Sequence, residues 1–355
     1  MKSRLMPVTA LRAGALASTL AVGACGGNSL ELDGRDKYTL GNEEHVFYRQ
    51  QGTVYAIQVD AQRLYWISGS SVRPSALRSC VSTACDDTVV TYADLGVVTD
   101  QRLVWTFTVA DGMIYWAHPR NGIVEEIVSC PVSGCQGAPT FITEGYQTRS
   151  ILVRGQTIYW SSETDRAILS CPLVGCSTPK VVAANMEAPV GLSATSEQLY
   201  FGSADQVFSY ALDGGSPPRV FLAEQSGVGA VLATTTDLFW WVGGDTRRLV
   251  SCPLPGCAGA PRVVTQDEFL YPFVADAERA YWLSSDVFAT PPNTSIRGVD
   301  LTMAGTPFEF YRGESASAFG PVWLAMNADY VYWAGWGTGD SSSAALHSAI
   351  YRMAR

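Results

Sequence analysis

Three features of the sequence predict an all-β protein, a β-propeller of four-stranded blades. A phrase made of a turn, an apolar residue and an aromatic pair recurs every 39 to 51 residues, a period typical of solenoids and propellers. Short segments rich in β-branched and aromatic residues, separated by turn residues, have the pattern of strands. No segment joins an apolar 3.6-residue period to caps at both ends, which argues against helical repeats.

The repeated phrase predicts seven blades. Its copies are "DAQRLYW", "ADGMIYW", "RGQTIYW", "TSEQLYF", "TTTDLFW", "DAERAYW" and "NADYVYW", with aromatic pairs that begin at Tyr65, Tyr115, Tyr159, Tyr200, Phe239, Tyr281 and Tyr332. Neighbouring strand residues point to opposite faces, so both faces of this strand must be buried. Blades packed face to face in a ring bury both faces. The tryptophans of the phrase are therefore predicted to be core residues.

The strands of a blade are expected in the order A, B, C and D. In the third blade they are predicted at 151–154, 157–161, 167–171 and 180–183. The seventh repeat supplies a strand C at 349–353, and an unattached strand at 45–49 precedes the first blade. We therefore expect residues 45–49 to complete the seventh blade, which closes the ring and hides both edges.

The phrase "LYW" after a turn that contains aspartate resembles the YWTD and TolB-like β-propeller superfamily, over residues 45–355. The Thr-Asp that follows Tyr-Trp in that family is absent, and pairs such as Ile67-Ser68 and Ala117-His118 stand in its place. The resemblance implies six blades as the alternative to seven, because members of the family most often have six. It implies a fold and little more, since propellers host binders, scaffolds and enzymes.

Eight of the nine cysteines form four C-x4-C pairs between strands C and D: Cys80/Cys85, Cys130/Cys135, Cys171/Cys176 and Cys252/Cys257. The fourth blade has Tyr210 and Gly215 at the two positions, so both cysteines are missing together. Two cysteines that are absent together from one blade are predicted to be bonded to each other in the blades that have them. Each such disulfide would contribute only about 2 kcal/mol to the stability of the fold, because the loop that it closes is short. The alternatives are a metal site, which needs four convergent ligands, and a redox centre, usually C-x-x-C. Neither a metal nor a cofactor is predicted.

Residues 1–24 have the pattern of an export signal, with a basic start and a short apolar stretch at 13–24. The stretch Val22-Gly23-Ala24-Cys25 resembles the lipobox of bacterial lipoproteins, which implies cleavage before Cys25 and acylation of its thiol. The predicted organisation is a signal peptide at 1–24, an anchor cysteine and linker at 25–44, and one propeller domain at 45–355. An ordinary secretory signal with an unmodified Cys25 is the alternative. An exported protein would lie in an oxidising compartment, where disulfides persist. The outer membrane or cell surface is the favoured location.

The charge of the chain restricts its partners. Residues 1–24 contain three basic and no acidic residues, so without them 21 basic and 33 acidic residues remain, a formal charge of −12. An acidic surface repels nucleic acid and anionic lipid. We predict a monomer that binds an unknown protein or glycan, with the lipid anchor as its contact with the membrane.

Loop lengths give the candidate site. The B–C connections of the last two blades are long, at 285–295 and 335–348, and binding residues tend to lie on long loops of a rigid scaffold. The candidate binding residues on these and the other B–C connections are Arg120, Asp165, Arg166, Asp245, Arg247, Arg248, Asp286, Asn293, Trp336 and Asp340. Each alone could equally be a solvated surface residue.

The predicted function is a non-enzymatic interaction scaffold. The chain has no nucleophile elbow, zinc-protease, P-loop or calcium-loop motif, and no catalytic residue is assigned. The alternative is a hydrolase or lyase acting at the central mouth of the ring, and a purely structural envelope protein is a third possibility. Segments near strand A, such as "PFVADA" and "PVGLSAT", are mostly apolar and small, which favours binding.

Overall fold

The computed structural model describes residues 45–70, 73–96, 106–120, 124–243, 247–267, 272–286, 293–302, 305–312, 319–336 and 347–355. All of them belong to the compact unit Tyr38–Arg355. The predicted signal peptide, Cys25 and the linker to residue 44 lie outside the described residues. No helix among the described residues is long and apolar enough to cross a membrane.

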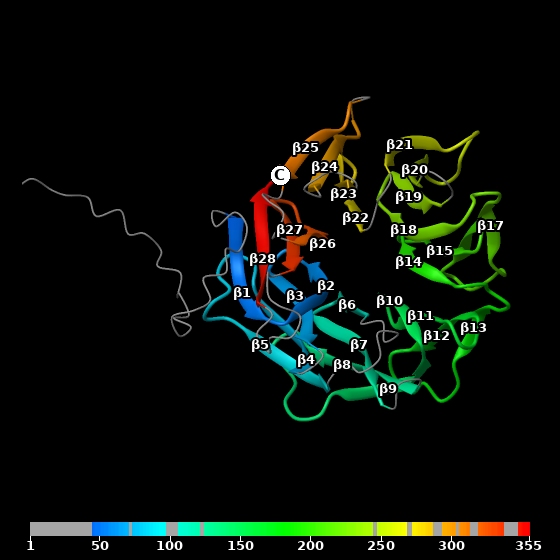
Figure 1. Ribbon diagram of the computed structural model, residues 1–355. Helices are drawn as coiled ribbons and strands as arrows, with labels where there is room; N and C mark the ends of the chain where they lie inside the picture. Colours follow the sequence, from blue (N-terminus) through cyan, green and yellow to red (C-terminus); the bar gives the residue numbers. More distant parts are fainter. Residues whose placement is uncertain are drawn as a thin grey trace, which may run out of the picture. The chain divides into compact units, whose positions relative to one another are not determined.

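The described residues form seven antiparallel four-stranded sheets arranged as a ring, which confirms the predicted seven-bladed propeller (Figure 1). Strand A of each blade lies nearest the centre and strand D lies at the rim. Blades one to three comprise β2 Thr53–Val59, β3 Arg63–Ser70, β4 Arg73–Val81 and β5 Val90–Gly96; β6 Phe107–Ala110, β7 Met113–Pro119, β8 Val124–Pro131 and β9 Thr140–Tyr146; and β10 Thr148–Arg154, β11 Thr157–Ser162, β12 Ala167–Pro172 and β13 Lys180–Ala183. The strands predicted for blade three are confirmed, although strand A begins three residues earlier than expected.

Blades four to seven follow the same order of strands. They comprise β14 Val190–Ala194, β15 Gln198–Ser203, β16 Gln206–Ala211 and β17 Arg219–Leu222; β18 Val228–Ala233, β19 Asp237–Val242, β20 Arg247–Pro253 and β21 Arg262–Asp267; β22 Phe273–Ala275, β23 Arg279–Asp286, β24 Asn293–Asp300 and β25 Phe308–Arg312; and β26 Phe319–Met326, β27 Tyr330–Trp336 and β28 His347–Ala354, with β1 Val46–Gln51 as strand D.

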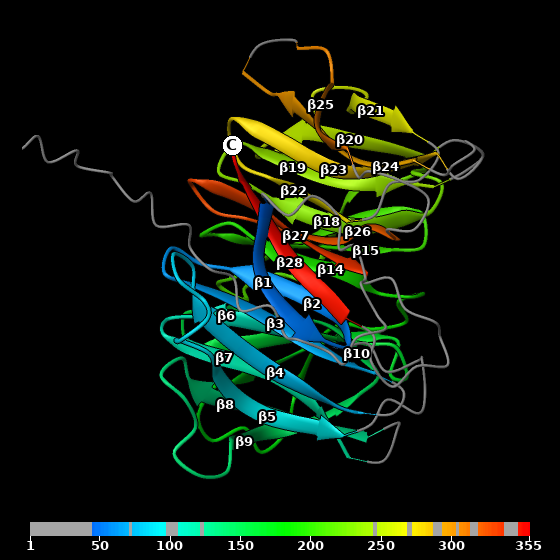
Figure 2. The same ribbon diagram turned by 60° about the vertical axis from the view of Figure 1, so that its left-hand side comes forward.

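The N-terminal strand closes the ring, as predicted. β1 pairs antiparallel with β28, with Arg49 opposite Ala349, and Figure 2 shows the two strands side by side. The guanidinium of Arg352 in β28 lies 4.3 Å from the ring centre of Phe47 in β1 and 4.7 Å from that of Tyr330 in β27. A cation over aromatic faces is attracted to them, so this contact supports the joint between the first and last strands.

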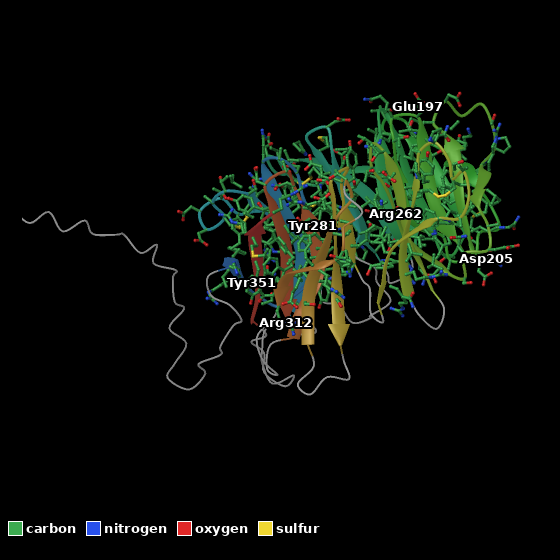
Figure 3. The ribbon with its side chains drawn as sticks, turned by 90° about the horizontal axis from the view of Figure 1, so that it is seen from above. Glu197, Asp205, Arg262, Tyr281, Arg312 and Tyr351 are labelled. Carbon is green, nitrogen blue, oxygen red and sulfur yellow. A yellow bond between two sulfur atoms is a disulfide. The ribbon has the colours of Figure 1, made fainter. Side chains whose placement is uncertain are left out.

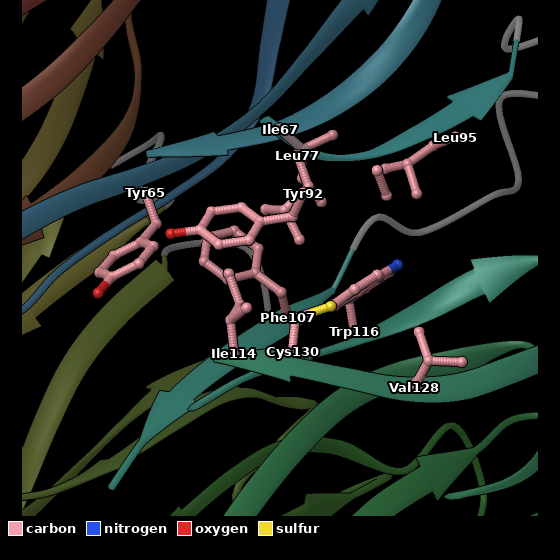
Figure 4. Close-up of a cluster of buried hydrophobic side chains, with 11 residues drawn as sticks. Tyr65, Ile67, Leu77, Tyr92, Leu95, Phe107, Ile114, Trp116, Val128 and Cys130 are labelled. Atoms are coloured by element: carbon pink, nitrogen blue, oxygen red, sulfur yellow. The ribbon is translucent and has the colours of Figure 1, made fainter. Parts of the chain in front are cut away.

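The core lies between neighbouring blades. One cluster combines Tyr65 and Leu77 of blade one with Phe107 and Trp116 of blade two (Figure 4). Trp66, the neighbour of Tyr65, packs on the other side of its strand, against blade seven. The aromatic pair therefore reaches both adjoining blades, which is why it breaks the usual alternation of a half-exposed strand.

The tryptophans of the phrase are core residues, as predicted. Trp66, Trp116, Trp160, Trp240, Trp282 and Trp333 each expose 1% or less of their surface. Trp241, outside the repeated position, is also buried and packs edge to face on Phe273 of the next blade, 5.3 Å between ring centres. Trp241 is therefore a packing residue.

Candidate functional site

The strand order gives the ring two faces. The A–B and C–D turns lie on one face, called the A–B face here, and the B–C and D–A connections lie on the other, the B–C face. Figure 3 shows the ring edge-on, with Glu197 of an A–B turn at its upper edge and Asp205 of a B–C turn lower down. A ligand can bind on either face or at the central mouth.

Disulfides lie on the A–B face in four blades. Cys80–Cys85, Cys130–Cys135, Cys171–Cys176 and Cys252–Cys257 are bonded, with Cα atoms 4.9 to 5.6 Å apart. The first cysteine of each pair is the last residue but one of strand C, and the second lies in the C–D turn. Disulfides persist in extracellular or other oxidising compartments, and the four bonds indicate such a compartment.

The A–B turns share a hydrogen-bond pattern in five blades. The first residue of each phrase accepts backbone N–H groups two and three residues on, through its side-chain oxygen: Asp60, Thr195, Thr234, Asp276 and Asn327. Such Asx and Thr turns satisfy the backbone locally. Blades two and three use two-residue turns, with Ala110 and Arg154 as the first residue of the phrase.

A pocket of about 600 Å³ opens at the mouth of the A–B face, along blades three to six. It is lined by Arg154, Ala194, Thr195, Ser196, Ala233, Thr234, Thr235, Ala275, Asp276 and Ala277. A second pocket of about 290 Å³ lies between the A–B turns of blades one and seven. The larger one has the size of a small-molecule site and combines a cation with hydroxyl groups.

Two charged side chains line the larger pocket. Arg154 is exposed and donates from Nη2 to the backbone oxygen of Ala194 in the next blade, at 2.9 Å. Asp276 forms an ion pair with Arg355. Burial alone would raise the pKa of Asp276, but hydrogen bonds from Arg355 and from the N–H groups of Arg279 and Glu278 hold it below its ordinary value. Asp276 is thus a carboxylate held in an ion pair.

The B–C face carries ion-paired charges on blades two and three. Arg120, in the B–C connection of blade two, lies 3.4 Å from Glu126 and 3.5 Å from Glu144. Arg149 at the start of blade three donates from Nε to Glu163 at 2.7 Å. Nearby Glu125 is buried and accepts the N–H of Thr148 at 2.8 Å. Burial raises the pKa of this carboxyl, and the hydrogen bonds of Thr148 and the charge of Arg149 offset part of the rise.

The described candidate residues lie at the B–C face, but several of them belong to strands and not to the predicted loops. Asp165 and Arg166 occupy the B–C turn of blade three, where Asp165 accepts the Ser162 hydroxyl at 2.7 Å. Arg247 and Arg248 were predicted in a loop, but they are the first residues of strand β20, opposite Asp267 and Gln266 of β21.

The remaining candidates lie at strand ends or outside the described residues. Asp286 ends β23 and pairs with Asn293, the first residue of β24, and Trp336 ends β27. Asp245 and Asp340 lie outside the described residues. Among the described residues, no group of three or more histidine, cysteine or acidic side chains could hold a metal ion.

From the sequence alone, the central mouth is considered only as the site of an alternative function, and none of the residues that line the mouth pocket is predicted as a binding residue. Its signal is present at the first position of the seven phrases, which reads Asp60, Ala110, Arg154, Thr195, Thr234, Asp276 and Asn327. Arg154 is the single cation in this series. The residue directly before the first residue of each phrase is alanine in blades four to six, at Ala194, Ala233 and Ala275. It is valine or methionine in the other blades.

Comparison with curated proteins gives a partial match. No family model matches the chain. The proteins named cueball from Drosophila sechellia and Drosophila simulans are 24% identical over 123 residues, 34% of this chain. The matched segment spans 18% of the length of those relatives.

Solved structures with a similar fold include several β-propellers. A prolyl endopeptidase has a TM-score of 0.57 at 11% identity, covering 88% of this chain and 51% of that one. The β-propeller domain of the Trilobed protease from Pyrococcus furiosus has a TM-score of 0.57 at 6% identity, covering 86% and 98%. The WD40 β-propeller domain of Doa1 has a TM-score of 0.53 at 10% identity, covering 86% and 96%. At these identities the likeness shows the fold alone.

Proposed function

We propose that this protein is a non-enzymatic binding scaffold whose B–C face contacts a protein or glycan partner. The observation that carries the proposal is the row of charged side chains on adjacent blades two and three, where Arg120 and Arg149 are held by acidic neighbours. Charges held in ion pairs keep a defined geometry, and complementary charges steer association and select partners.

The rigidity of the ring supports a scaffold role. Neighbouring blades share continuous apolar cores, and the N-terminal strand closes the ring. Loops on such a support can carry binding residues without loss of the fold. Strands β23 and β27 end on the same face, at Asp286 and Trp336, and the middle parts of the long connections predicted at 285–295 and 335–348 lie outside the described residues.

The proposal includes a lipid anchor at Cys25 and a place at the outer membrane or cell surface. The lipobox-like stretch before Cys25 and the four disulfides of the propeller support export to an oxidising compartment. Two or more acyl chains would hold the protein stably on a membrane, whereas one would bind reversibly.

The alternative of a hydrolase or lyase at the central mouth needs a free acid or base there. Asp276 is the carboxylate among the described residues that line the larger mouth pocket, and its ion pair with Arg355 and its lowered pKa disfavour proton transfer. The binding scaffold is therefore the better supported function.

A pull-down tests the partner surface. The full-length chain, purified oxidised, would be compared with a variant carrying Arg120→Glu and Arg149→Glu, using an envelope extract of the native cell. The control carries Arg219→Glu and Arg262→Glu, exposed residues that follow the C–D turns on the A–B face. We expect the first variant to lose a partner that the wild type and the control retain. Equal retention by all three would contradict the proposed surface.

Metabolic labelling tests the anchor. The chain and its Cys25→Ser variant would be expressed in a bacterial host fed labelled palmitate. We expect label on the wild type only, and membrane release of the variant. A wild-type chain without label would contradict the anchor at Cys25.

A further inference from the structure

We propose that the mouth pocket on the A–B face binds an acidic saccharide, with its carboxylate on Arg154 and its hydroxyl groups on Ser196 and Thr235. This site lies on the face opposite the proposed partner surface and does not depend on it. Four neighbouring blades contribute to it, through the first residues of their repeated phrases and, in blades four to six, the alanine just before the phrase.

Small side chains line much of the pocket. In blades four, five and six the last residue of strand A is alanine, at Ala194, Ala233 and Ala275, and all three line the pocket. The residues that pair at the same register in the other blades are Val59, Val109, Val153 and Met326. Most residues that line the pocket of about 600 Å³ belong to the three blades that carry alanine at this register.

Arg154 stands at the edge of this space, in blade three. One of its terminal nitrogens donates to the Ala194 oxygen at 2.9 Å, which fixes the side chain across the joint between blades three and four. A guanidinium has five N–H donors in a planar fork, so donors remain for a ligand. A fixed, exposed guanidinium is suited to a carboxylate, which it can bind with two parallel hydrogen bonds.

The turn hydrogen bonds decide which hydroxyl groups can meet a ligand. Thr195 and Thr234 use their hydroxyl oxygens to accept backbone N–H groups of their own turns, at 3.0 to 3.3 Å. Ser196 and Thr235 follow them, are exposed and line the pocket. Each supplies a hydroxyl that both donates and accepts, as the hydroxyl groups of a sugar require.

The charge in the pocket favours an anion. Asp276, in blade six, is paired with Arg355, which also lies 3.9 Å from Glu278. Among the described residues that line the pocket, Arg154 is the charged one without an ion pair. A ligand with one negative charge and several hydroxyl groups matches this set, and a pocket of this size accommodates one or two sugar rings.

Titration calorimetry of the full-length oxidised chain tests the site with three probes. Methyl glucuronide carries the carboxylate and hydroxyls, methyl glucoside the hydroxyls alone, and acetate the carboxylate alone. We expect saturable binding of the glucuronide, about tenfold or more tighter than either other probe. Glucoside binding as tight as glucuronide binding would overturn the role of Arg154. Acetate binding as tight as glucuronide binding would overturn the saccharide.

Variants locate the site. Arg154→Gln should weaken glucuronide binding about tenfold or more, and Arg154→Lys should weaken it less because the charge remains. Thr235→Val should reduce the preference for glucuronide over acetate while the charge stays in place. Arg219→Gln, which removes a charge from the same face outside the pocket, should bind as the wild type does. Unchanged binding in Arg154→Gln, with its unfolding midpoint as in the wild type, would overturn the proposal.

Discussion

Blades three and four hold the same turn in two different ways. Cys171 of blade three pairs with Ile158, and Tyr210 of blade four pairs with Leu199, so the two residues occupy one register position. Both are buried, at 2% and 5% exposed. Cys171 is bonded to Cys176 within its own turn, whereas the Tyr210 hydroxyl accepts a hydrogen bond from Lys180 of blade three at 3.2 Å.

The rest of the C–D turn of blade four is also held by local hydrogen bonding and not by a disulfide. In blade four, Asp213 accepts the N–H of Gly215 at 2.9 Å, and Gly214 adopts a positive φ of 70°. A short polar side chain and a glycine thus shape the turn that a disulfide closes in blade three. Both blades contain the repeated aromatic phrase, but only blade three has the disulfide. The comparison therefore indicates that the phrase determines the fold of the blade and that the disulfide stabilises only one turn.

The largest expected effect tests this conclusion at the shared aromatic position. Trp160→Ala in blade three and Phe201→Ala in blade four both empty fully buried sites. Each should lower the free energy of unfolding by about 3–5 kcal/mol, measured by urea denaturation. A much smaller loss in blade three than in blade four would show that the disulfide takes over the role of the core there.

The second effect concerns the bridge itself. Replacing Cys171 and Cys176 together with alanine should cost about 2 kcal/mol, because the closed loop is short. The intact mass of the wild type should rise by about eight hydrogens on reduction and that of the variant by about six, since each disulfide takes up two. A loss as large as that of Trp160→Ala would contradict the limited role assigned to the bridge.

The fold could be predicted from the sequence because its signals are local. The phrase occurs once in each blade, and its aromatic pair indicates that both faces of one strand are buried. Tyr65 and Trp66 are an example, since they pack against different neighbouring blades. The joint loss of cysteines at Tyr210 and Gly215 reported bonding between neighbours in the chain. None of these inferences requires knowledge of which blades meet.

The mouth pocket could not be predicted in the same way, because it depends on the curvature of the ring. Arg154 and Asp276 belong to blades separated by two others, and the sequence does not reveal that both line one pocket. Arg247 and Arg248 were assigned to a loop because no apolar residue marks their segment. Pairing with Asp267 and Gln266 of a long β21 extends strand C to include them.

A third prediction isolates the contact that replaces the bridge. Tyr210→Phe keeps the buried ring and removes the hydroxyl that Lys180 meets, and it should cost about 1 kcal/mol. A double-mutant cycle with Lys180→Met should give a coupling energy of the same order. Additive losses would show that the two side chains act separately and that blade four needs no link to blade three at this turn.

The smallest effect at neutral pH concerns a second joint between blades, where Glu125 of blade two accepts the N–H of Thr148 in blade three. Burial raises the pKa of Glu125 in the folded state. The folded protein then binds more protons than the unfolded chain between the ordinary glutamate pKa and the raised value. The contribution of Glu125 to stability is therefore full below the ordinary pKa and falls as pH rises through the folded pKa.

Glu125→Gln should remove this loss, because the amide oxygen can still accept the Thr148 N–H and carries no charge to bury. We expect a higher urea midpoint than wild type at pH 8 and a smaller difference at pH 5. Glu163→Gln serves as the control, since Glu163 is partly exposed in its pair with Arg149. A Glu125→Gln midpoint below wild type at pH 8 would mean that the carboxylate charge strengthens the joint. The polar joints between blades two and three and between blades three and four would then both depend on a charged group, as the contact of Lys180 with Tyr210 does.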